Sequence, residues 1–165
     1  MMGGSSATAT TASESRFRVR APNSAPRAVM VVALDPLAAS LVDDLARRAW
    51  RGTTFFTAAA PTPAGSFARW LTDVTGHTAD LVAEIARADI VQLVTMAGQA
   101  APAASMIAEA CALQSVKTSG LVVDDRGAGP AALSHSLAIL RPFVVTLSVI
   151  GAADTAGEIL HALGG

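Results

Sequence analysis

Apolar runs rich in valine alternate with segments of helical period from residue 28 onward. The first run, 28–34, reads AVMVVAL, and Leu37, Leu41 and Leu45 recur at helical spacing within residues 37–50. A strand that is apolar at every position is typical of a sheet covered on both faces. Strands separated by helical crossovers pair in parallel. The sequence therefore predicts the α/β class, with a doubly wound, mainly parallel five-stranded sheet in a Rossmann-like three-layer sandwich.

The same alternation predicts strands at residues 28–34, 53–59, 89–95, 116–123 and 143–150. It predicts helices at residues 37–50, 78–88, 102–114, 130–141 and 153–163. Gly52 is expected to end the first helix, and Thr78 to cap the second. Residues 62–77 lack a clear period, and we expect a surface loop there with a short packed turn or helix at Trp70 and Leu71.

Residues 1–26 differ in composition from the rest of the chain. They are rich in Ser, Thr and Ala, carry no apolar period, and become basic through Arg16, Arg18 and Arg20. Such a segment buries too little apolar surface to offset the entropy of ordering it, which predicts a disordered tail. An organelle transit peptide has a similar composition and remains the alternative. Residues 27–165 are expected to form a single α/β domain.

Charge and cysteine content exclude several classes of function. The 165 residues carry 12 Lys and Arg against 13 Asp and Glu, so no nucleic-acid partner is expected. Cys111 is the only cysteine, which excludes an intrachain disulfide framework and a Cys-based zinc site. No apolar run approaches the roughly 20 residues of a membrane-spanning helix. The apolar region of a secretory signal is also missing, and we expect a cytoplasmic protein.

Ligands of doubly wound sheets bind beyond the carboxyl ends of the strands, where this chain has few glycines. The first such turn, 35–40, reads DPLAAS, whereas a phosphate loop needs glycine so that backbone N–H groups approach the phosphate. Asp35 and Ser40 are expected to cap the following helix. The third turn holds Gly98 before Pro102, and it suits either an anion at a helix N-terminus or simple tight packing.

The fourth turn, 124–130, is the most polar of these loops. Asp124 and Asp125 there, together with Asp35, offer oxygen ligands for a hard cation. The alternative is a solvated turn in which Asp125 and Arg126 face water, and this interpretation is favoured. We therefore predict neither a resident metal ion nor a cofactor.

Other reactive residue types have simpler interpretations. Asp73 and His77 are four residues apart, but the Thr-Gly between them indicates a turn rather than a catalytic pair. Cys111 lies in a predicted helix with no basic neighbour, which is typical of a small buried apolar residue. The aromatic residues of this region, Phe55 and Phe56 in the second strand together with Trp50 and Trp70, are expected at the core and its rim.

Three stretches of the chain, residues 31–61, 88–123 and 140–150, resemble the nucleotide-binding half of the tubulin/FtsZ superfamily of polymerising GTPases. The segment 31–61 is similar to the opening strand, loop, helix and second strand of that family. Residues 88–91 (ADIV), 103–110 (AASMIAEA) and 118–123 (TSGLVV) resemble its next strand, helix and strand. Residues 140–150 (LRPFVVTLSVI) resemble the family's Leu-Arg-x-x-Val-Asp-Thr-Leu-Ile-Val-Ile strand. The resemblance implies the same kind of sheet over most of residues 28–154.

The loops depart from the pattern of the family. Its first loop is a run of glycines ending in Asn, where residues 35–40 read DPLAAS. Its GGGTGTG signature corresponds to residues 98–102, GQAAP, and its Asn-Thr-Asp to residues 59–61, AAP. The sequence also ends before the family's central helix and its second domain, which carries the acidic loop for GTP hydrolysis. No residue of this chain therefore inherits a GTP-binding or catalytic role from the resemblance.

The leading hypothesis is an FtsZ-like scaffold or accessory domain that does not hydrolyse GTP. It would act through protein–protein interaction, with a partner protein or by self-association, and would not be an enzyme. The alternative is a ligand-binding or enzymatic Rossmann-like domain for a nucleotide or sugar phosphate. Its site at the ends of the strands would use Asp35, Ser40, Gly98, Asp124, Asp125 and Arg126.

Overall fold

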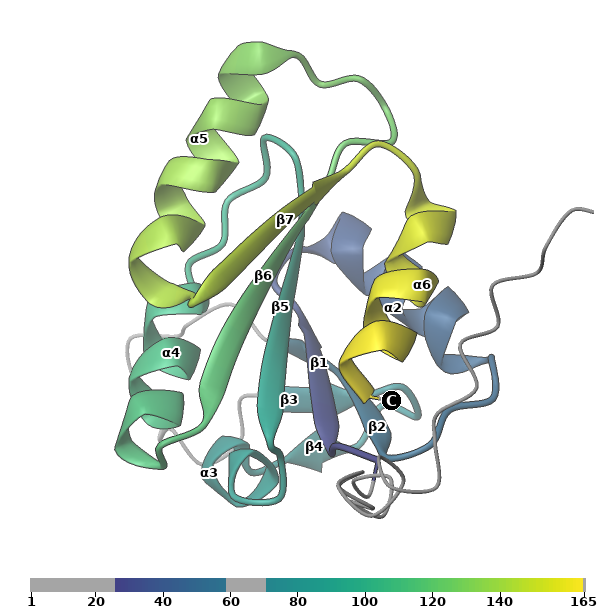
Figure 1. Ribbon diagram of the computed structural model, residues 1–165, viewed down its shortest axis with the longest axis vertical. Coiled ribbons are helices and arrows are strands. Elements are labelled where there is room, and N and C mark those ends of the chain that lie inside the picture. The colour runs from purple at the N-terminus through teal and green to yellow at the C-terminus, as the bar shows by residue number, and fades with distance from the viewer. Residues whose placement is uncertain (1–25, 59–70, 165) are drawn as a thin grey trace, which may run out of the picture.

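The computed structural model of the chain describes residues 26–58 and 71–164, which form one sheet flanked by helices (Figure 1). The strands are β1 (Val29–Ala33), β2 (Thr53–Ala58), β3 (Leu71–Asp73), β4 (Thr78–Ala79), β5 (Ile90–Met96), β6 (Lys117–Val123) and β7 (Thr146–Ile150). The helices are α2 (Pro36–Ala46), α3 (Leu81–Ile85), α4 (Ala104–Leu113), α5 (Pro130–Leu140), the 3₁₀ turn η2 (Arg141–Phe143) and α6 (Ala153–Gly164).

The sheet has seven strands in the order β4-β3-β2-β1-β5-β6-β7. All pairs from β2 to β7 are parallel, which confirms the α/β class and is consistent with a Rossmann-like fold. The predicted count of five strands is wrong, because β3 and β4 add an antiparallel hairpin beside β2. Residues 62–77 were expected to be a loop, but their last part enters the sheet at Leu71.

Asp80 explains why the helix expected from Thr78 begins later. Thr78 pairs with Thr72 in the hairpin, and the chain turns into α3 only at Leu81. The side chain of Asp80 accepts a hydrogen bond from the backbone N–H of Ala83 at 2.9 Å and so caps the helix. The predicted cap at Thr78 is therefore wrong by two residues.

Gly52 has a different role from the one expected. Helix α2 ends at Ala46, six residues earlier, and Gly52 adopts a φ of +67° just before β2. A Cβ at this position would lie 3.2 Å from the carbonyl oxygen of Arg27. Glycine therefore permits the close approach of two chain segments, rather than ending the helix.

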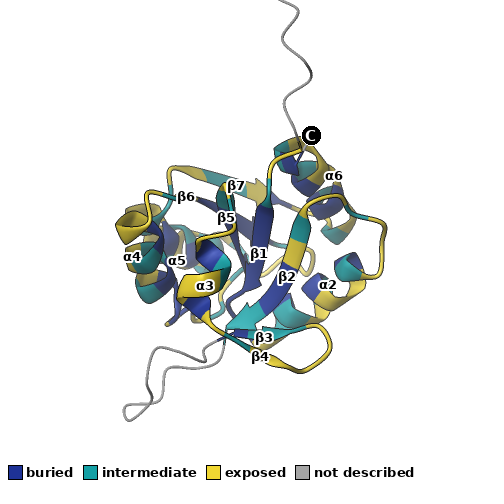
Figure 2. Cartoon of the chain, turned by 90° about the horizontal axis from the view of Figure 1, so that it is seen from below, coloured by how far each residue is buried: buried dark blue, intermediate teal, exposed yellow. Residues whose placement is uncertain are grey.

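Helices cover both faces of the sheet. Helices α2 and α6 pack over one face, and α3, α4 and α5 pack over the other (Figures 1 and 2). The central strand β1 is buried at every position, as its apolar run predicts. In the described part of the chain, no helix combines the length and the apolar character that crossing a bilayer requires.

Candidate functional site

The order of the parallel strands defines one crevice. From β1 the chain crosses to β2 on one side, and from β5 it proceeds to β6 and β7 on the other. The connections that leave β1 and β5 therefore diverge, and doubly wound proteins bind ligands at such a point. Asp35 follows β1 here, and the loop 97–103 follows β5.

Asp35 fills this crevice with its own carboxylate. The side chain is 5% exposed, and its Oδ1 accepts hydrogen bonds from the backbone N–H groups of Leu37 (3.0 Å) and Ala38 (2.9 Å). Its Oδ2 accepts from the Thr95 hydroxyl (2.8 Å) and from the backbone N–H of Met96 (3.0 Å). The predicted cap is confirmed, and the same carboxylate also joins the ends of β1 and β5.

The first turn of α2 has no N–H group left for a ligand. Pro36 has none, and Leu37 and Ala38 donate to the Asp35 side chain. The N–H of Ala39 donates to the carbonyl of Asp35 at 2.9 Å. A phosphate binds at a helix N-terminus through these groups, so the chain's own carboxylate takes the place of an external anion.

Ser40 lies away from the crevice. It is exposed on α2, and its hydroxyl donates to the carbonyl of Pro36 at 3.4 Å, one turn earlier in the helix. The expectation that Ser40 helps to cap the helix is therefore wrong, because a cap accepts hydrogen bonds from the free N–H groups of the first turn.

The loop after β5 is fastened to α5. The backbone N–H of Gly98 donates to the hydroxyl of the buried Ser136 at 2.9 Å. Gly98 adopts a φ of +83°, and a Cβ there would lie 3.1 Å from the Cβ of Ala132. These contacts agree with the tight-packing interpretation of the loop. Nothing in the sequence indicated Ser136, because its role depends on how α5 lies beside the loop after β5.

The polar turn between β6 and α5 is held by its own backbone. The Oδ1 of Asp124 accepts from the N–H of Ala128 at 2.6 Å, and the N–H of Asp124 donates to the carbonyl of Ile150 at 2.8 Å. Asp125 and Arg126 are exposed, with 4.0 Å between Oδ1 and Nε. Within residues 26–58 and 71–164, no three His, Cys, Asp or Glu side chains are grouped so as to hold a metal ion.

Asp73 and His77 close the β3–β4 turn, as the sequence indicates. The Oδ1 of Asp73 accepts from the Thr75 hydroxyl (2.6 Å), the Thr75 N–H (2.9 Å) and the His77 N–H (2.9 Å). The hydrogen bond from the Thr75 side chain, followed by that from the His77 backbone, lowers the pKa of Asp73 below its usual value. Its carboxylate is committed to the turn.

Cys111 is buried in α4, in the apolar layer between that helix and the sheet. Burial raises the pKa of its thiol to about 12. A thiol that stays protonated at neutral pH is a poor nucleophile, which agrees with its interpretation as a small apolar residue.

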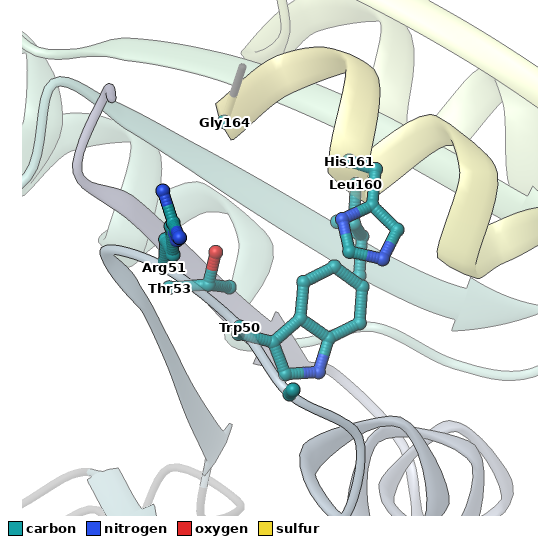
Figure 3. Close-up of a pocket in the computed structure, with 7 residues that line it drawn as sticks. Trp50, Arg51, Thr53, Leu160, His161 and Gly164 are labelled. Atoms are coloured by element: carbon teal, nitrogen blue, oxygen red, sulfur yellow. The ribbon is translucent and has the colours of Figure 1, made fainter. Parts of the chain in front are cut away.

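Three hollows formed by described residues include none of Asp35, Gly98, Asp124, Asp125 and Arg126. The smallest, of about 190 Å³, lies at the amino end of β2 beside α6, and Trp50, Arg51, Thr53 and His161 line it (Figure 3). The rings of Trp50 and His161 stack with centroids 4.2 Å apart. Their stacking fastens α6 to the connection between α2 and β2.

A comparison with models of known protein families found no match, and a comparison with curated proteins found none either. What the crevice can do therefore follows from its geometry. It holds the buried Asp35 carboxylate, which accepts hydrogen bonds from four donors, and beside it the loop of Gly98, which is bonded to α5.

Proposed function

We propose that this chain is an FtsZ-like accessory or scaffold domain that binds no nucleotide and acts through contact with protein. The carrying observation is the side chain of Asp35. Its carboxylate and its carbonyl take every N–H group in the first turn of α2, so a phosphate would have to displace a buried, hydrogen-bonded charge. Two like charges in one buried crevice repel strongly, which opposes any triphosphate there.

The loop after β5 supports the same proposal. In the family that the sequence resembles, a run of glycines cradles the phosphates at this place. Here Gly98 donates its N–H to Ser136, and Pro102 has no N–H to give. The N–H groups of Gly98 and of the first turn of α2 therefore already have partners within the chain, and Pro102 lacks one.

Exposed apolar side chains support a role in protein contact. A shallow hollow of about 510 Å³ lies between α4 and η2, with Ala108, Ala112, Phe143 and Val145 among its lining residues. Val145 is 74% exposed, and Leu113 on α4 is 84% exposed. Exposed apolar patches mark protein interaction sites in soluble domains.

Titration calorimetry and thermal unfolding test the proposal. The full chain is mixed with GTP, GDP, ATP, NAD or a sugar phosphate, each with and without Mg²⁺. We expect no heat of binding and no rise in Tm, whereas a ligand at about 100 times its Kd would add about 2.7 kcal/mol of stability. Stoichiometric binding of a guanine nucleotide would overturn the proposal, and binding of a sugar phosphate would favour a ligand-binding domain instead.

Chemical cross-linking tests the part that concerns protein contact. The chain is cross-linked in solution and in extracts of cells that express it, and the products are identified by mass spectrometry. We expect a defined product that contains the chain and a partner protein or a second copy. A chain that yields only uncross-linked monomer in both settings would contradict a scaffold role.

A further inference from the structure

Strand β7 is an edge strand whose outer side has no pairing partner among the described residues. It is the last strand in the sheet order, and among the described residues only β6 pairs with it. Val145, just before the strand, is 74% exposed, and Val149 within it is 44% exposed, whereas β1 is buried throughout. The outer N–H and C=O groups of such a strand are a template for another strand.

Natural edge strands usually carry a charge, a proline or a bulge, or are very short. The opposite edge of this sheet follows that pattern, since β4 has two residues and is followed by Asp80. Residues 144–151 read VVTLSVIG and contain neither a charged residue nor a proline. The contrast between the two edges indicates that β7 is covered in the working protein.

The residues along β7 read nearly the same in both directions. Val145, Thr146, Leu147, Ser148 and Val149 alternate apolar and hydroxyl side chains about Leu147. Antiparallel pairing of two copies about a two-fold axis at Leu147 sets Val145 opposite Val149 of the second copy. It also sets Thr146 opposite Ser148. Both kinds of cross-strand pair are favourable, and no like charges meet along the strand.

Charge at the two ends of β7 favours the same orientation. Arg141 precedes the strand, and Lys117 begins the neighbouring β6, although Glu109 lies nearby in the hollow that Lys117 also lines. Beyond the carboxyl ends lie Asp124, Asp125 and Asp154, with Arg126 4.0 Å from Asp125 and Arg48 3.8 Å from Asp154, so one negative charge remains in excess there. Antiparallel pairing brings the more basic end of one copy to the more acidic end of the other.

We infer that two copies of this chain form a two-fold dimer by antiparallel pairing of their β7 strands. This inference rests on the proposed function and names its partner as a second copy. The apolar side chains of the pair would extend the layer beneath α4 and α5, in which Leu147 already packs. A five-residue strand buries less than the roughly 1,200–2,000 Å² of a standard interface, so the dimer dissociates in the micromolar range or above.

Sedimentation equilibrium of the full chain over low to high micromolar concentrations tests the pairing. We expect the wild type to follow a monomer–dimer equilibrium with no larger species, because each copy offers one such edge. Val145→Lys with Val149→Lys sets lysine opposite lysine in both symmetric pairs, and dimerisation should weaken at least tenfold. Val145→Lys with Val149→Glu sets lysine opposite glutamate in both pairs, and the dimer should return.

Val82→Lys is the matched control, since Val82 is 47% exposed on α3 and lies away from β7. It should dimerise like the wild type. Circular dichroism checks that each variant is folded. Hydrogen exchange of the wild type tests the same pairing independently of any substitution. Protection of β7 amides should rise with protein concentration.

Three results would overturn the pairing. They are a wild type that stays monomeric throughout, a double-lysine variant that dimerises as well as the wild type, and a lysine–glutamate variant no better than the double-lysine one. If a chain lacking residues 1–25 dimerises where the full chain does not, the amino-terminal segment covers β7 instead. If the wild type is monomeric and binds no nucleotide, only the dimer is refuted. If it binds a nucleotide, the proposed function is refuted.

Discussion

At the residue scale, one buried carboxylate joins two strands and starts a helix. Asp35 takes hydrogen bonds from the backbone of α2 on one oxygen and from β5 on the other. Hydrogen bonds to an ionised group are stronger than those between neutral groups. The side chain that occupies the crevice should therefore also stabilise the fold.

We expect Asp35→Ala to lower the free energy of unfolding by about 3 kcal/mol, because four donors lose their acceptor and most of them stay buried. Asp35→Asn keeps one acceptor oxygen and should lose less. Urea denaturation followed by circular dichroism measures both. Ser40→Ala, on the exposed side of α2, is the control and should change stability by less than about 0.5 kcal/mol. Equal midpoints for Asp35→Ala and Ser40→Ala would contradict the role of Asp35.

The thiol of Cys111 reports on opening of the core. Because burial raises its pKa to about 12, the native thiol stays protonated where the unfolded one, near pH 9, ionises. Alkylation by iodoacetamide at pH 8.5 should be slow in the native protein and fast in urea. Because the unfolded thiol ionises at a lower pH than the native one, the free energy of unfolding should not depend on Cys111 below about pH 9. It should fall as the pH rises from there toward 12. Similar alkylation rates in native and urea-unfolded protein would show that Cys111 is accessible.

At the element scale, a single glycine sets how closely the loop after β5 approaches α5. Gly98 combines a positive φ with a neighbouring Cβ at 3.1 Å, whereas Gly127 has a φ of +62° and no atom within 4 Å of a Cβ. The two positions share backbone strain but differ in packing. They form a matched pair that separates one effect from the other.

Gly127→Ala should lower the free energy of unfolding by about 1 kcal/mol, from left-handed backbone strain alone. We expect Gly98→Ala to lower it by about 1 kcal/mol more, because the added methyl group also presses on Ala132. Parallel urea titrations give both values. Equal losses at the two positions would mean that α5 yields freely and that the loop is not tightly packed against it.

At the scale of the whole molecule, burial is concentrated at the centre of the sheet. Strands β1, β5 and β6 have neighbours on both sides and helices on both faces, whereas β4 and β7 each pair with one strand. Opening of a region has a lower free energy where few apolar contacts must break. The two edges should therefore open before the centre does.

Hydrogen exchange followed by mass spectrometry checks this order. Amides of β1 and β5 should exchange only through global unfolding, and those of β4 and of dilute β7 should exchange much faster. Raising the protein concentration should slow the exchange of the β7 amides and leave the exchange of the β4 amides unchanged. Uniform exchange across all strands would indicate that the sheet opens as one unit.

The sequence predicts the elements that are long enough to show a repeating apolar pattern. It does not predict the short strands, whose formation depends on pairing with a neighbouring strand. Strands β1 and β5 were foreseen because their apolar runs fit a doubly covered sheet. Strands β3 and β4 have three and two residues, which is too short for a period, and they exist because β2 offers an edge. Their hairpin therefore appeared in the sequence only as an irregular segment.

In the candidate site too, contacts between neighbours in sequence could be predicted, and contacts between distant segments could not. Asp35 before a helical period indicates a cap, since a cap depends on neighbours in sequence. Its bonds to Thr95 and Met96 depend on β1 and β5 lying side by side, which no local pattern reveals. Ser136 and His161 were missed for the same reason, because their partners lie 38 and 111 positions earlier.

The stacked Trp50 and His161 rings provide an intrinsic fluorescence probe of how α6 is attached. The chain contains no tyrosine and two tryptophans, so its ultraviolet emission comes from indole alone. The imidazole of His161, 4.2 Å from the indole of Trp50, is close enough to alter that emission. Detachment of the last helix should therefore change the emission of Trp50, and stopped-flow fluorimetry can detect that change without any added dye.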